Sequence, residues 1–464
     1  MQQEFHSSGN ANYLTAMRDY YNSGATKTYA FRKEQLRKLK GAVLKYEGDI
    51  HHALWLDLKK SAAESYAGET GLLLAEIRVA ISNLQKWMRP KSVPGNLVNY
   101  PSTSKIYHDP LGVVLIIAPW NYPFQLSLIP LVGAIAAGNC SVLKPSEFAP
   151  ATADILQKII AEIYPAEYVS IVLGDGAAVI PEMIRSFRFD HIFYTGSKNV
   201  GKIIYQMAAA DLVPVTLELG GKSPAIIEDD ANIRVTARRI ALAKFANIGQ
   251  TCVAPDYLLV HEGIQTKFIE ELKQCLVEFF GTDPLISRSY GKIINEKRFD
   301  QLVSYLDQGE IIFGGQHNRS ALCISPTLMI HVSTESPLMT DEIFGPILPI
   351  FPFKQRDEAL SILQLNPDPL SFYVFTSDSN KEKSWVEGIR FGGGCVNNAA
   401  WQFTSHHLPF GGVGFSGIGA YHGKYSFKTF THAKPILKSA TWIDLNLKYP
   451  PFDGKLKWFK RFIW

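Results

Sequence analysis

The sequence predicts an α/β fold built around parallel sheets with helices on both faces. Apolar strands alternate with helical segments between residues 108 and 216, and a second alternation runs from about Val215 to Val396. The 464 residues are too many for one ordinary core, so the chain should form two or three domains. Apolar residues make up 46% and charged residues 19%, which is typical of a globular enzyme, and a net charge of +4 gives no reason to expect a nucleic-acid partner.

The segments follow one another in the order that this fold requires. Apolar residues recur at helical spacing in Phe31–Tyr46 and Ala67–Trp87, and Val98–Tyr107 has the pattern of two short strands around Pro101-Ser102, which predicts a hairpin or arm. The first alternation then consists of strand Val113–Ile117, a helix over Leu128–Ala137, strand Ser141–Leu143, a helix over Ala151–Ile163, and strands Val169–Leu173 and His191–Tyr194.

One uncharged stretch, from Leu111 to Leu143, has the length of a membrane span. Pro119, Pro123 and Pro130 interrupt it, and the backbone groups that such breaks expose are costly in lipid. We therefore expect a buried strand, a turn, a buried helix and a second buried strand.

Five cysteines are spread through the chain without a Cys-x-x-Cys pair or the spacing of a zinc or iron–sulfur site. A sparse and odd number favours a reducing compartment, and the first residues have no signal-peptide pattern. We therefore expect a cytoplasmic protein without a bound metal ion. The five are Cys140, Cys252, Cys275, Cys323 and Cys395.

Cys252 differs from the other four because it follows the turn Gly249-Gln250-Thr251 and precedes the apolar strand Tyr257–Val260. A thiol on a turn at the mouth of a strand can be exposed and can have a lowered pKa, as a nucleophile requires. An ordinary buried cysteine is the alternative that spacing alone leaves open.

Two polar residues at strand ends could assist such a nucleophile. Glu218 lies among leucines directly before Gly220-Gly221, where desolvation would raise its pKa and suit it to general-base catalysis. A salt bridge to Lys222 is the structural alternative. Asn121 follows the strand Val113–Ile117, and its amide could either donate to an oxyanion or simply stabilise a turn.

Two other segments have the residues of a dinucleotide site. In Lys144-Pro145-Ser146-Glu147, the lysine and the glutamate follow a strand and could both bond ribose hydroxyls. Thr195-Gly196-Ser197 ends another strand and opens a helix that includes Gly201, and a helix N-terminus favours phosphate. By contrast, the Gly-x-Gly-x-x-Gly match at 412–417 has no strand–helix–strand unit after it and carries no weight.

Seven motifs together resemble those of the aldehyde dehydrogenase superfamily in order and spacing. The resemblance covers residues 10 to 435 or so, and the short N-terminus and the segment 421–427 are similar to the class 3 and fatty-aldehyde branch. The motifs are Pro119-Trp120-Asn121-Tyr122-Pro123, Lys144-Pro145-Ser146-Glu147, Thr195-Gly196-Ser197, Glu218-Leu219-Gly220-Gly221-Lys222, Gly249-Gln250-Thr251-Cys252, Glu342-Ile343-Phe344-Gly345-Pro346 and Leu408-Pro409-Phe410-Gly411-Gly412.

This resemblance implies a role for each marked residue. Cys252 would be the nucleophile and Glu218 the general base, while Asn121 and the Cys252 backbone N–H would donate to the oxyanion. Tyr122 and Trp401 would line the aldehyde tunnel. The cofactor would be held by Lys144, Glu147, Gly196, Ser197, Gly201, Leu219, Glu342 and Phe344.

The implied reaction is the oxidation of an aldehyde to a carboxylic acid with NAD, or also NADP, through a thiohemiacetal and a thioester on Cys252. Medium- or long-chain aliphatic and aromatic aldehydes are the expected substrates. Three alternatives are a CoA-acylating enzyme, which Glu218 argues against, a catalytically silent dinucleotide-binding protein, and a thiol esterase. Lys198 stands where threonine is commoner and would add a charge near the phosphates. Segment 397–405, which would shape the tunnel, differs from many relatives, so the individual substrate stays open.

The implied architecture has four parts. A Rossmann-type cofactor domain would comprise residues 1–97 and 108–216, and an α/β catalytic domain residues 217–398. Residues 98–107 and 412–438 would form a small β arm, and residues 439–464 a tail. An arm that cannot bury its own face implies an oligomer, by resemblance a homodimer.

The end of the tail combines cations with large apolar side chains. At helical spacing Leu456, Phe459 and Ile463 fall on one side, and Lys457, Lys460 and Arg461 fall largely on another. Two readings follow: the aromatic side chains pack on the body or on a partner subunit, or the segment forms an amphipathic helix that contacts anionic lipid peripherally.

Overall fold

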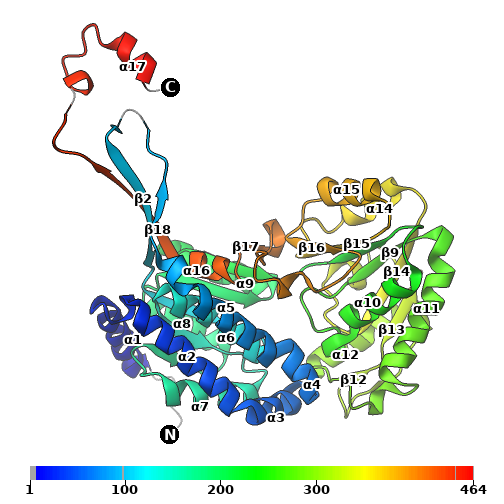
Figure 1. Cartoon of the computed structure of the whole chain (residues 1–464). Helices are drawn as coiled ribbons and strands as arrows, with labels where there is room; N and C mark the ends of the chain where they lie inside the picture. The colour runs from blue at the N-terminus through cyan, green and yellow to red at the C-terminus, as the bar shows by residue number, and fades with distance from the viewer. Residues whose placement is uncertain (1–6, 97–98, 445, 463–464) are drawn as a thin grey trace.

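The computed structural model describes residues 7–96, 99–444 and 446–462. Figure 1 shows two α/β bodies side by side and a narrow β arm that projects from the first of them. Each body is built on one largely parallel sheet, of six strands in the first and seven in the second. The predicted α/β class with parallel sheets is therefore confirmed.

The sheet of the first body has the strand order β17-β7-β6-β3-β4-β5, and only the β17–β7 pair is antiparallel. The chain builds outward from β3 on one side and then returns to build outward on the other. In sheets with such a reversal, ligands bind at the carboxyl ends of the two strands on either side of it, which here are β3 and β6. The strands are β3 (Val113–Ile117), β4 (Cys140–Lys144), β5 (Val169–Ile171), β6 (His191–Gly196), β7 (Val215–Leu219) and β17 (Gly417–Ile418).

Helices from both ends of the chain cover this sheet. The predicted helices Phe31–Tyr46 and Ala67–Trp87 correspond to α2 and to η2 with α5, which differ by a few residues at their ends. The helices are α1 (Ser7–Asn22), α2 (Tyr29–Lys45), α3 (Glu47–Leu58), α4 (Ala62–Ser65), the π-helical turn η2 (Tyr66–Thr70), α5 (Gly71–Met88), α6 (Pro123–Ala137), α7 (Pro150–Ile163), α8 (Gly176–Ser186), α9 (Lys198–Ala210) and α16 (Lys424–Thr429).

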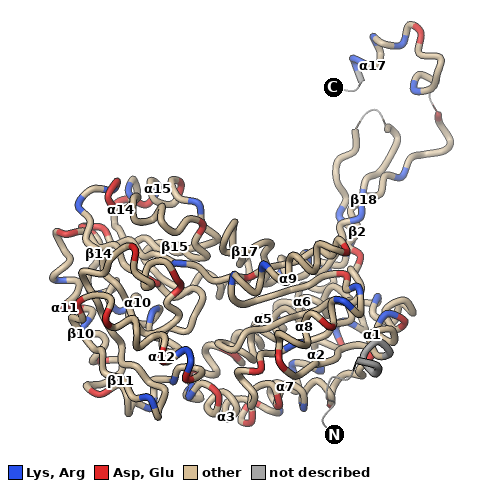
Figure 2. Tube along the Cα trace, turned by 180° about the vertical axis from the view of Figure 1, so that it is seen from behind, with Lys and Arg blue, Asp and Glu red and all other residues tan. Residues whose placement is uncertain are grey.

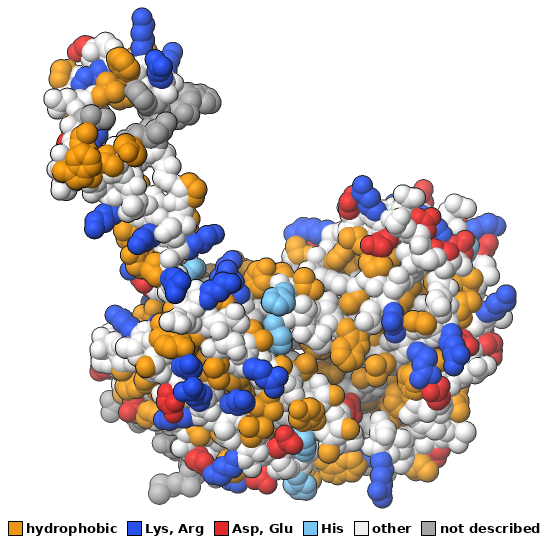
Figure 3. Space-filling model, in the orientation of Figure 1, with side chains coloured by type: hydrophobic (Ala, Val, Ile, Leu, Met, Phe, Trp, Pro, Cys, Tyr) orange, Lys and Arg blue, Asp and Glu red, His pale blue; other side chains and the backbone are white. Residues whose placement is uncertain are grey.

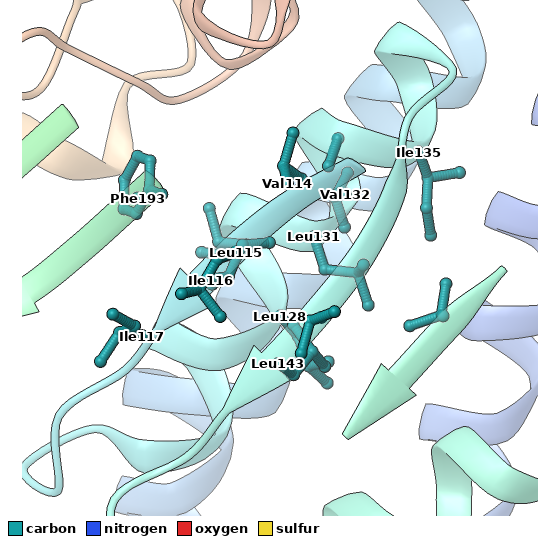
Figure 4. Packing of buried hydrophobic residues seen from close by; sticks show 14 of the residues in the cluster. Val114, Leu115, Ile116, Ile117, Leu128, Leu131, Val132, Ile135, Leu143 and Phe193 are labelled. Atoms are coloured by element: carbon teal, nitrogen blue, oxygen red, sulfur yellow. The ribbon is translucent and has the colours of Figure 1, made fainter. Parts of the chain in front are cut away.

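The uncharged stretch 111–143 forms the centre of the first body. It consists of β3, α6 and β4, all buried, and Figure 4 shows their apolar side chains gathered in one core. The helix begins at Pro123, five residues before the predicted start, because proline is favoured in the first turn of a helix. No helix in the described part of the chain is long and apolar enough to cross a membrane.

The sheet of the second body has the order β10-β13-β14-β9-β8-β15-β16, with only the β10–β13 pair antiparallel. Its strands are β8 (Pro224–Ile227), β9 (Tyr257–His261), β10 (Glu310–Phe313), β13 (Thr327–Ile330), β14 (Ile347–Phe353), β15 (Ser371–Phe375) and β16 (Gly393–Val396), and β11 (His317–Asn318) and β12 (Cys323–Ile324) form a separate pair. Its helices are α10 (Ile233–Phe245), the 3₁₀ turn η4 (Ala246–Gly249), α11 (Glu262–Phe280), α12 (Glu296–Ser304), α13 (Pro337–Thr340), α14 (Arg356–Leu363) and α15 (Ser379–Gly388).

The arm differs in its boundaries from the sequence-based expectation. Its three antiparallel strands are β1 (Lys91–Val93), β2 (Ser102–Pro110) and β18 (Thr431–Ser439). The predicted reversal at Pro101-Ser102 is wrong, because β2 runs on from Ser102 and pairs along its whole length with β18. Val98, the predicted start of the arm, lies outside the described residues.

Part of the segment 412–438 belongs to the first body rather than to the arm. β17 pairs with β7, and α16 packs against α6. The reason is hydrophobic, since Tyr421, Phe427 and Phe430 are all buried in the core of that body.

The tail stands clear of both bodies beyond the arm, as Figures 1 and 2 show from opposite sides. Its helix α17 (Leu456–Phe462) leaves Leu456 and Trp458 63% and 49% exposed, so the tail does not dock on the body of its own chain. The reading in which it packs there is wrong. Ile463 and Trp464, part of the predicted amphipathic pattern, lie outside the described residues.

Candidate active site

The carboxyl ends of the parallel strands of the first sheet bring the predicted polar residues together. Asn121 follows β3, Lys144 ends β4 and Gly196 ends β6. Glu218 is the penultimate residue of β7 and lies opposite Thr195 in the register. Four strands thus bring candidate groups to one edge of the sheet. This is the edge at which ligands bind when the order of the strands reverses, as it does between β3 and β6.

Cys252 reaches this edge from the second body on the loop 246–252, which we call the nucleophile loop. Asn247, Ile248 and Gly249 have positive φ angles of 49°, 52° and 79°, a left-handed run that two non-glycine residues rarely adopt. A Cβ at Gly249 would collide with the backbone carbonyl of Gly345, so the loop packs closely on the segment that follows Glu342. The loop therefore holds Cys252 half-buried in a fixed, strained conformation.

The nucleophile loop is bonded directly to the segment 118–122 between β3 and α6, which we call the oxyanion loop. The Asn121 side-chain Nδ2 donates to the carbonyl of Gln250 at 3.0 Å, and the hydroxyls of Tyr122 and Thr251 lie 3.0 Å apart. An amide nitrogen carries two hydrogens, so one remains for a substrate oxygen next to Cys252.

Two buried carboxyl groups face the thiol from other segments. Both oxygens of Glu218 are buried without a hydrogen-bond partner in the described residues, and burial raises its pKa well above the ordinary value. The alternative of a Glu218–Lys222 salt bridge is wrong, because Lys222 pairs with Asp256 at 2.6 Å. Glu342 is held against Gly220, where a Cβ would collide with its carboxyl, and burial raises its pKa to about 8.

The pKa of the Cys252 thiol is raised rather than lowered. Burial, followed by the nearby carboxylates of Glu342 and Glu218, raises its pKa to about 12, while the backbone N–H groups of Cys252 and Val253 act in the opposite direction. The expectation of a lowered pKa is therefore wrong for this arrangement, because the charges that face the thiol are negative.

A second group of residues lies along the same edge and fits a dinucleotide. Lys144 is buried and donates to Glu147 at 3.1 Å, and Glu147 also accepts from the Gly176 backbone N–H at 3.0 Å. A lysine ammonium and a carboxylate therefore lie side by side at the end of β4. Ribose hydroxyls can accept a hydrogen bond from the first group and donate one to the second.

The phosphate side of this site is the N-terminus of α9. The Ser197 side chain caps that helix, and Lys198 lies over the ring of Phe415 at 4.3 Å. A Cβ at Gly201 would come within 2.6 Å of Leu219, so the helix approaches β7 as closely as glycine permits. The hydroxyl of Thr195 is buried there without a partner in the described residues, which leaves a polar atom for a ligand.

Glu342 and Phe344 extend the site toward the second body. Phe344 has a positive φ of 44° and packs edge to face on Trp120, next to the oxyanion loop, with ring centroids 5.3 Å apart. Arg298 donates to the backbone carbonyls of Glu342 and Ile343. The segment is thus held in one conformation between α12 and the oxyanion loop.

Trp401, which was predicted to line the aldehyde tunnel, does not lie with the residues around Cys252. It is 49% exposed and lines a surface pocket between α10 and α11 with Arg238, Arg239, Leu242 and Phe279. The neighbouring Gln402 turns inward instead and donates to Ser371 at 2.8 Å. Which of these adjacent residues faces inward could not be predicted from the residue types alone.

Sequence reasoning also missed a set of buried polar residues that surround the site. Lys60 and Glu69 form an ion pair of 2.6 Å next to Asn121, and Glu64 accepts from the Asn247 backbone N–H at 2.8 Å. These residues come from the end of α3, from α4 and from η2, far from the recognised motifs. In a sequence, single charges on amphipathic helices look like solvated surface groups.

Comparisons with known proteins agree with this geometry. The model of the aldehyde dehydrogenase family matches residues 11–436. The chain is 45% identical over 445 residues to the 4,4'-diaponeurosporen-aldehyde dehydrogenase of Staphylococcus aureus, with 96% of each chain covered, and 42% identical over 440 residues to human aldehyde dehydrogenase family 3 member B1, with 94% of each covered. The substrate-bound structure of Staphylococcus aureus AldH superimposes with a TM-score of 0.95 at 45% identity, covering 98% of this chain and 99% of that one.

These comparisons confirm the predicted fold, the class 3 branch and the oxidation of aldehydes with NAD(P). The match extends over more than nine tenths of the chain, so it includes both sheets and the segments that carry Asn121, Glu218 and Cys252. The chain therefore belongs to the aldehyde dehydrogenase family.

Proposed function

We propose that Cys252 is the nucleophile of an aldehyde dehydrogenase, that Asn121 is its oxyanion donor and that Glu218 activates the hydrolytic water. The observation that supports this most strongly is the buried Glu218 carboxyl group, which has no partner in the described residues and influences the titration of the Cys252 thiol. Carboxyl groups are seldom buried unpaired without a function.

The residues divide the reaction into two steps. The Cys252 thiolate adds to the aldehyde carbon, and the new oxyanion accepts hydrogen bonds from the Asn121 amide and the Cys252 backbone N–H; one such donor contributes about 10²–10³ in rate. A nicotinamide dinucleotide held at this edge would supply the hydride acceptor, and the loss of hydride from the Cys252 adduct leaves a thioester. Glu218 then takes a proton from water, which attacks the thioester carbon and releases the acid and the thiol.

The cofactor is held by the residues along the edge of the first sheet. Lys144 and Glu147 bind the adenosine ribose, Gly196 and Ser197 receive the pyrophosphate, and Gly201 with Leu219 permits the close approach of α9 to β7. Glu342 and Phe344 position the nicotinamide ribose and ring. The carboxylate of Glu147 would repel a 2′-phosphate, while Lys144 would partly compensate for it, so NAD is preferred and NADP is accepted less well.

We expect the absorbance of reduced nicotinamide to rise with medium- or long-chain aliphatic aldehydes and with aromatic aldehydes, faster with NAD than with NADP. The Staphylococcus aureus relative is named for 4,4'-diaponeurosporen-aldehyde, so this aldehyde is included among the substrates tested. A Glu147→Gln variant should narrow the gap between the cofactors, because it removes the charge that repels the phosphate. A kcat/KM for NADP above that for NAD in the unaltered protein would contradict the preference, and a requirement for CoA would favour the acylating alternative.

The raised thiol pKa predicts a pH dependence for Cys252. Below its pKa, the thiolate fraction of a thiol grows about tenfold per pH unit, so alkylation of Cys252 by iodoacetamide should accelerate steadily between about pH 7 and pH 10. Replacing Glu342 with glutamine removes one of the carboxylates that raise this pKa, so alkylation should become faster above about pH 8, where Glu342 is ionised. A rate that is flat over this range would mean that the thiol is already ionised.

A homodimer in the cytoplasm is the assembly that we propose. The strand β18 is mostly exposed along its length, although it pairs fully with β2, so the arm offers a surface that a second copy can cover. The apolar pocket between α10 and α11, with Trp401 at its rim, offers another. The cysteines are all free, which agrees with a reducing compartment.

For the tail we propose peripheral contact with anionic lipid. Figure 3 shows apolar and basic side chains together on the tail, and the exposed Leu456 and Trp458 are flanked by Lys457 and Lys460. The intact protein should sediment with anionic liposomes at low salt, less so at high salt, and a variant that ends before Leu456 should not. If the intact protein stays in the supernatant, while removal of the tail lowers the melting temperature or shifts the oligomer, the tail packs on a partner subunit instead.

A further inference from the structure

The buried pair of Lys60 and Glu69 lies directly beneath the oxyanion loop. Both side chains are fully buried, and Lys60 Nζ donates to Glu69 Oε1 at 2.6 Å. Removing two charges from water is costly, and such a pair is stable only when further hydrogen bonds satisfy both groups. The identity of those further partners therefore shows what the pair holds in place.

Within the described residues, the further hydrogen bonds of the pair go to the oxyanion loop or to the helix that follows it. Lys60 Nζ donates to the backbone carbonyl of Asn121 at 2.8 Å and lies 3.9 Å above the ring of Tyr122. The second oxygen of Glu69 accepts from the backbone N–H groups of Phe124 and Gln125, both at 3.0 Å, at the first turn of α6. The pair thus holds the chain on both sides of Asn121.

The same carbonyl also connects the oxyanion loop to the nucleophile loop. Asn247 Nδ2 donates to the Asn121 carbonyl at 2.9 Å, so both lone pairs of that oxygen are used, one by Lys60 and one by the nucleophile loop. The Asn121 amide in turn donates to Gln250. The peptide plane of Asn121, and with it the direction of its side chain, is fixed relative to Cys252 from two sides.

We propose that Lys60 and Glu69 are positioning residues that fix Asn121 relative to Cys252. The proposal rests on the proposed role of Asn121 as oxyanion donor. Without Lys60 the Asn121 carbonyl keeps one donor and the loop can shift, and a displacement of about 1 Å in a catalytic group can cost about 10²-fold in rate. The effect should appear in kcat rather than in dinucleotide affinity, because neither residue lies along the cofactor edge.

The test is a double-mutant cycle between the pair and Asn121. Lys60→Met and Glu69→Gln are introduced together, so that neither member of the ion pair stays buried without the other, both in the unaltered chain and in Asn121→Ala. The control is Arg18→Met with Asp190→Asn, an ion pair at the opposite end of β3. We measure kcat for aldehyde oxidation, ester hydrolysis, which needs no hydride transfer, dinucleotide affinity and melting temperature.

In the unaltered chain, the paired replacement should lower kcat and ester hydrolysis by about 10²-fold. In the Asn121→Ala chain the same replacement should lower them by no more than about threefold, because the group that it positions is absent. The control should keep its kcat at a similar loss of melting temperature. If the paired replacement lowered kcat by the same factor in both chains, or left kcat unaltered, the positioning role would be overturned while the oxyanion role of Asn121 would stand.

Full activity in Asn121→Ala would overturn the oxyanion role as well as this inference, so the two failures are distinguishable. If the paired variant does not fold, Glu69→Asp gives an equivalent test. Aspartate keeps the charge, but its side chain is one methylene shorter, so its carboxylate lies farther from the first turn of α6. We expect kcat to fall at least about tenfold. An unchanged kcat in folded Glu69→Asp would contradict the proposal.

Discussion

Replacing Cys252 with alanine should abolish aldehyde oxidation while dinucleotide still binds. The thiol is the group to which the covalent steps are assigned, and removal of a nucleophile usually costs more than about a thousandfold in rate. Lys144, Glu147 and Ser197 lie at the edge of the first sheet, whereas the nucleophile loop and β9 belong to the second body, so equilibrium binding of NAD should be retained. Initial rates with excess aldehyde and fluorescence titration with NAD measure the two quantities.

Cys275→Ala is a matched control, because Cys275 is also buried but lies within α11, away from the oxyanion loop. This variant should keep its kcat. Residual activity of Cys252→Ala above about a thousandth of the unaltered rate would rule out the covalent mechanism. Loss of activity in both variants would point instead to damage to the fold.

The residues proposed for chemistry could be found in the sequence because each stands at the end of an apolar strand. Asn121, Lys144 and Glu218 follow or end strands of one parallel sheet, and such strands bring their carboxyl ends to one edge. The alternation of apolar segments therefore located three residues that lie up to 97 positions apart (121 to 218). Cys252 was found in the same way, from a turn before a strand.

The residues that hold this group could not be found in that way. Lys60 lies in the turn between α3 and α4, and Glu69 lies in η2, so their burial depends on how the chain turns at Lys59, which has a positive φ of 56°. The pKa of Cys252 could not be predicted either, because it depends on two carboxyl groups that approach from separate segments. Long-range packing decides both, and a periodic pattern contains no information on it.

The boundary of the arm was missed for a related reason. Thr431–Ser439 follows α16 directly, and its assignment to the arm depends on the nine-residue pairing with β2, which is distant in the sequence. The role of Tyr421 in the first core was hidden in the same way, because a tyrosine near glycines resembles a turn.

Replacing Glu218 with glutamine should separate the two halves of the reaction. Glutamine keeps the shape of the side chain but cannot accept a proton from water, so a first burst of reduced nicotinamide should be followed by a slow steady state as the thioester accumulates. Rapid-mixing absorbance measures the burst and the steady rate in one experiment. A normal steady-state rate would remove Glu218 from the role of water activator.

The same substitution should make the protein more stable at high pH, and this effect has a definite sign. A carboxyl group whose pKa is raised in the folded state contributes stability that is present below its unfolded pKa and is lost as the pH rises toward the folded pKa. The buried Glu218 side chain therefore lowers the free energy of unfolding more at about pH 8 than at about pH 5, whereas a glutamine amide has the same effect at both pH values.

The melting temperature of Glu218→Gln should exceed that of the unaltered protein at the higher pH, and the difference should shrink at the lower one. An equal or larger difference at the lower pH would show that Glu218 is already ionised in the folded protein. If the difference shrinks at the lower pH as expected, the gain in stability and the loss of deacylation have one cause, since the desolvation that raises the pKa of Glu218 also makes it basic enough to activate water.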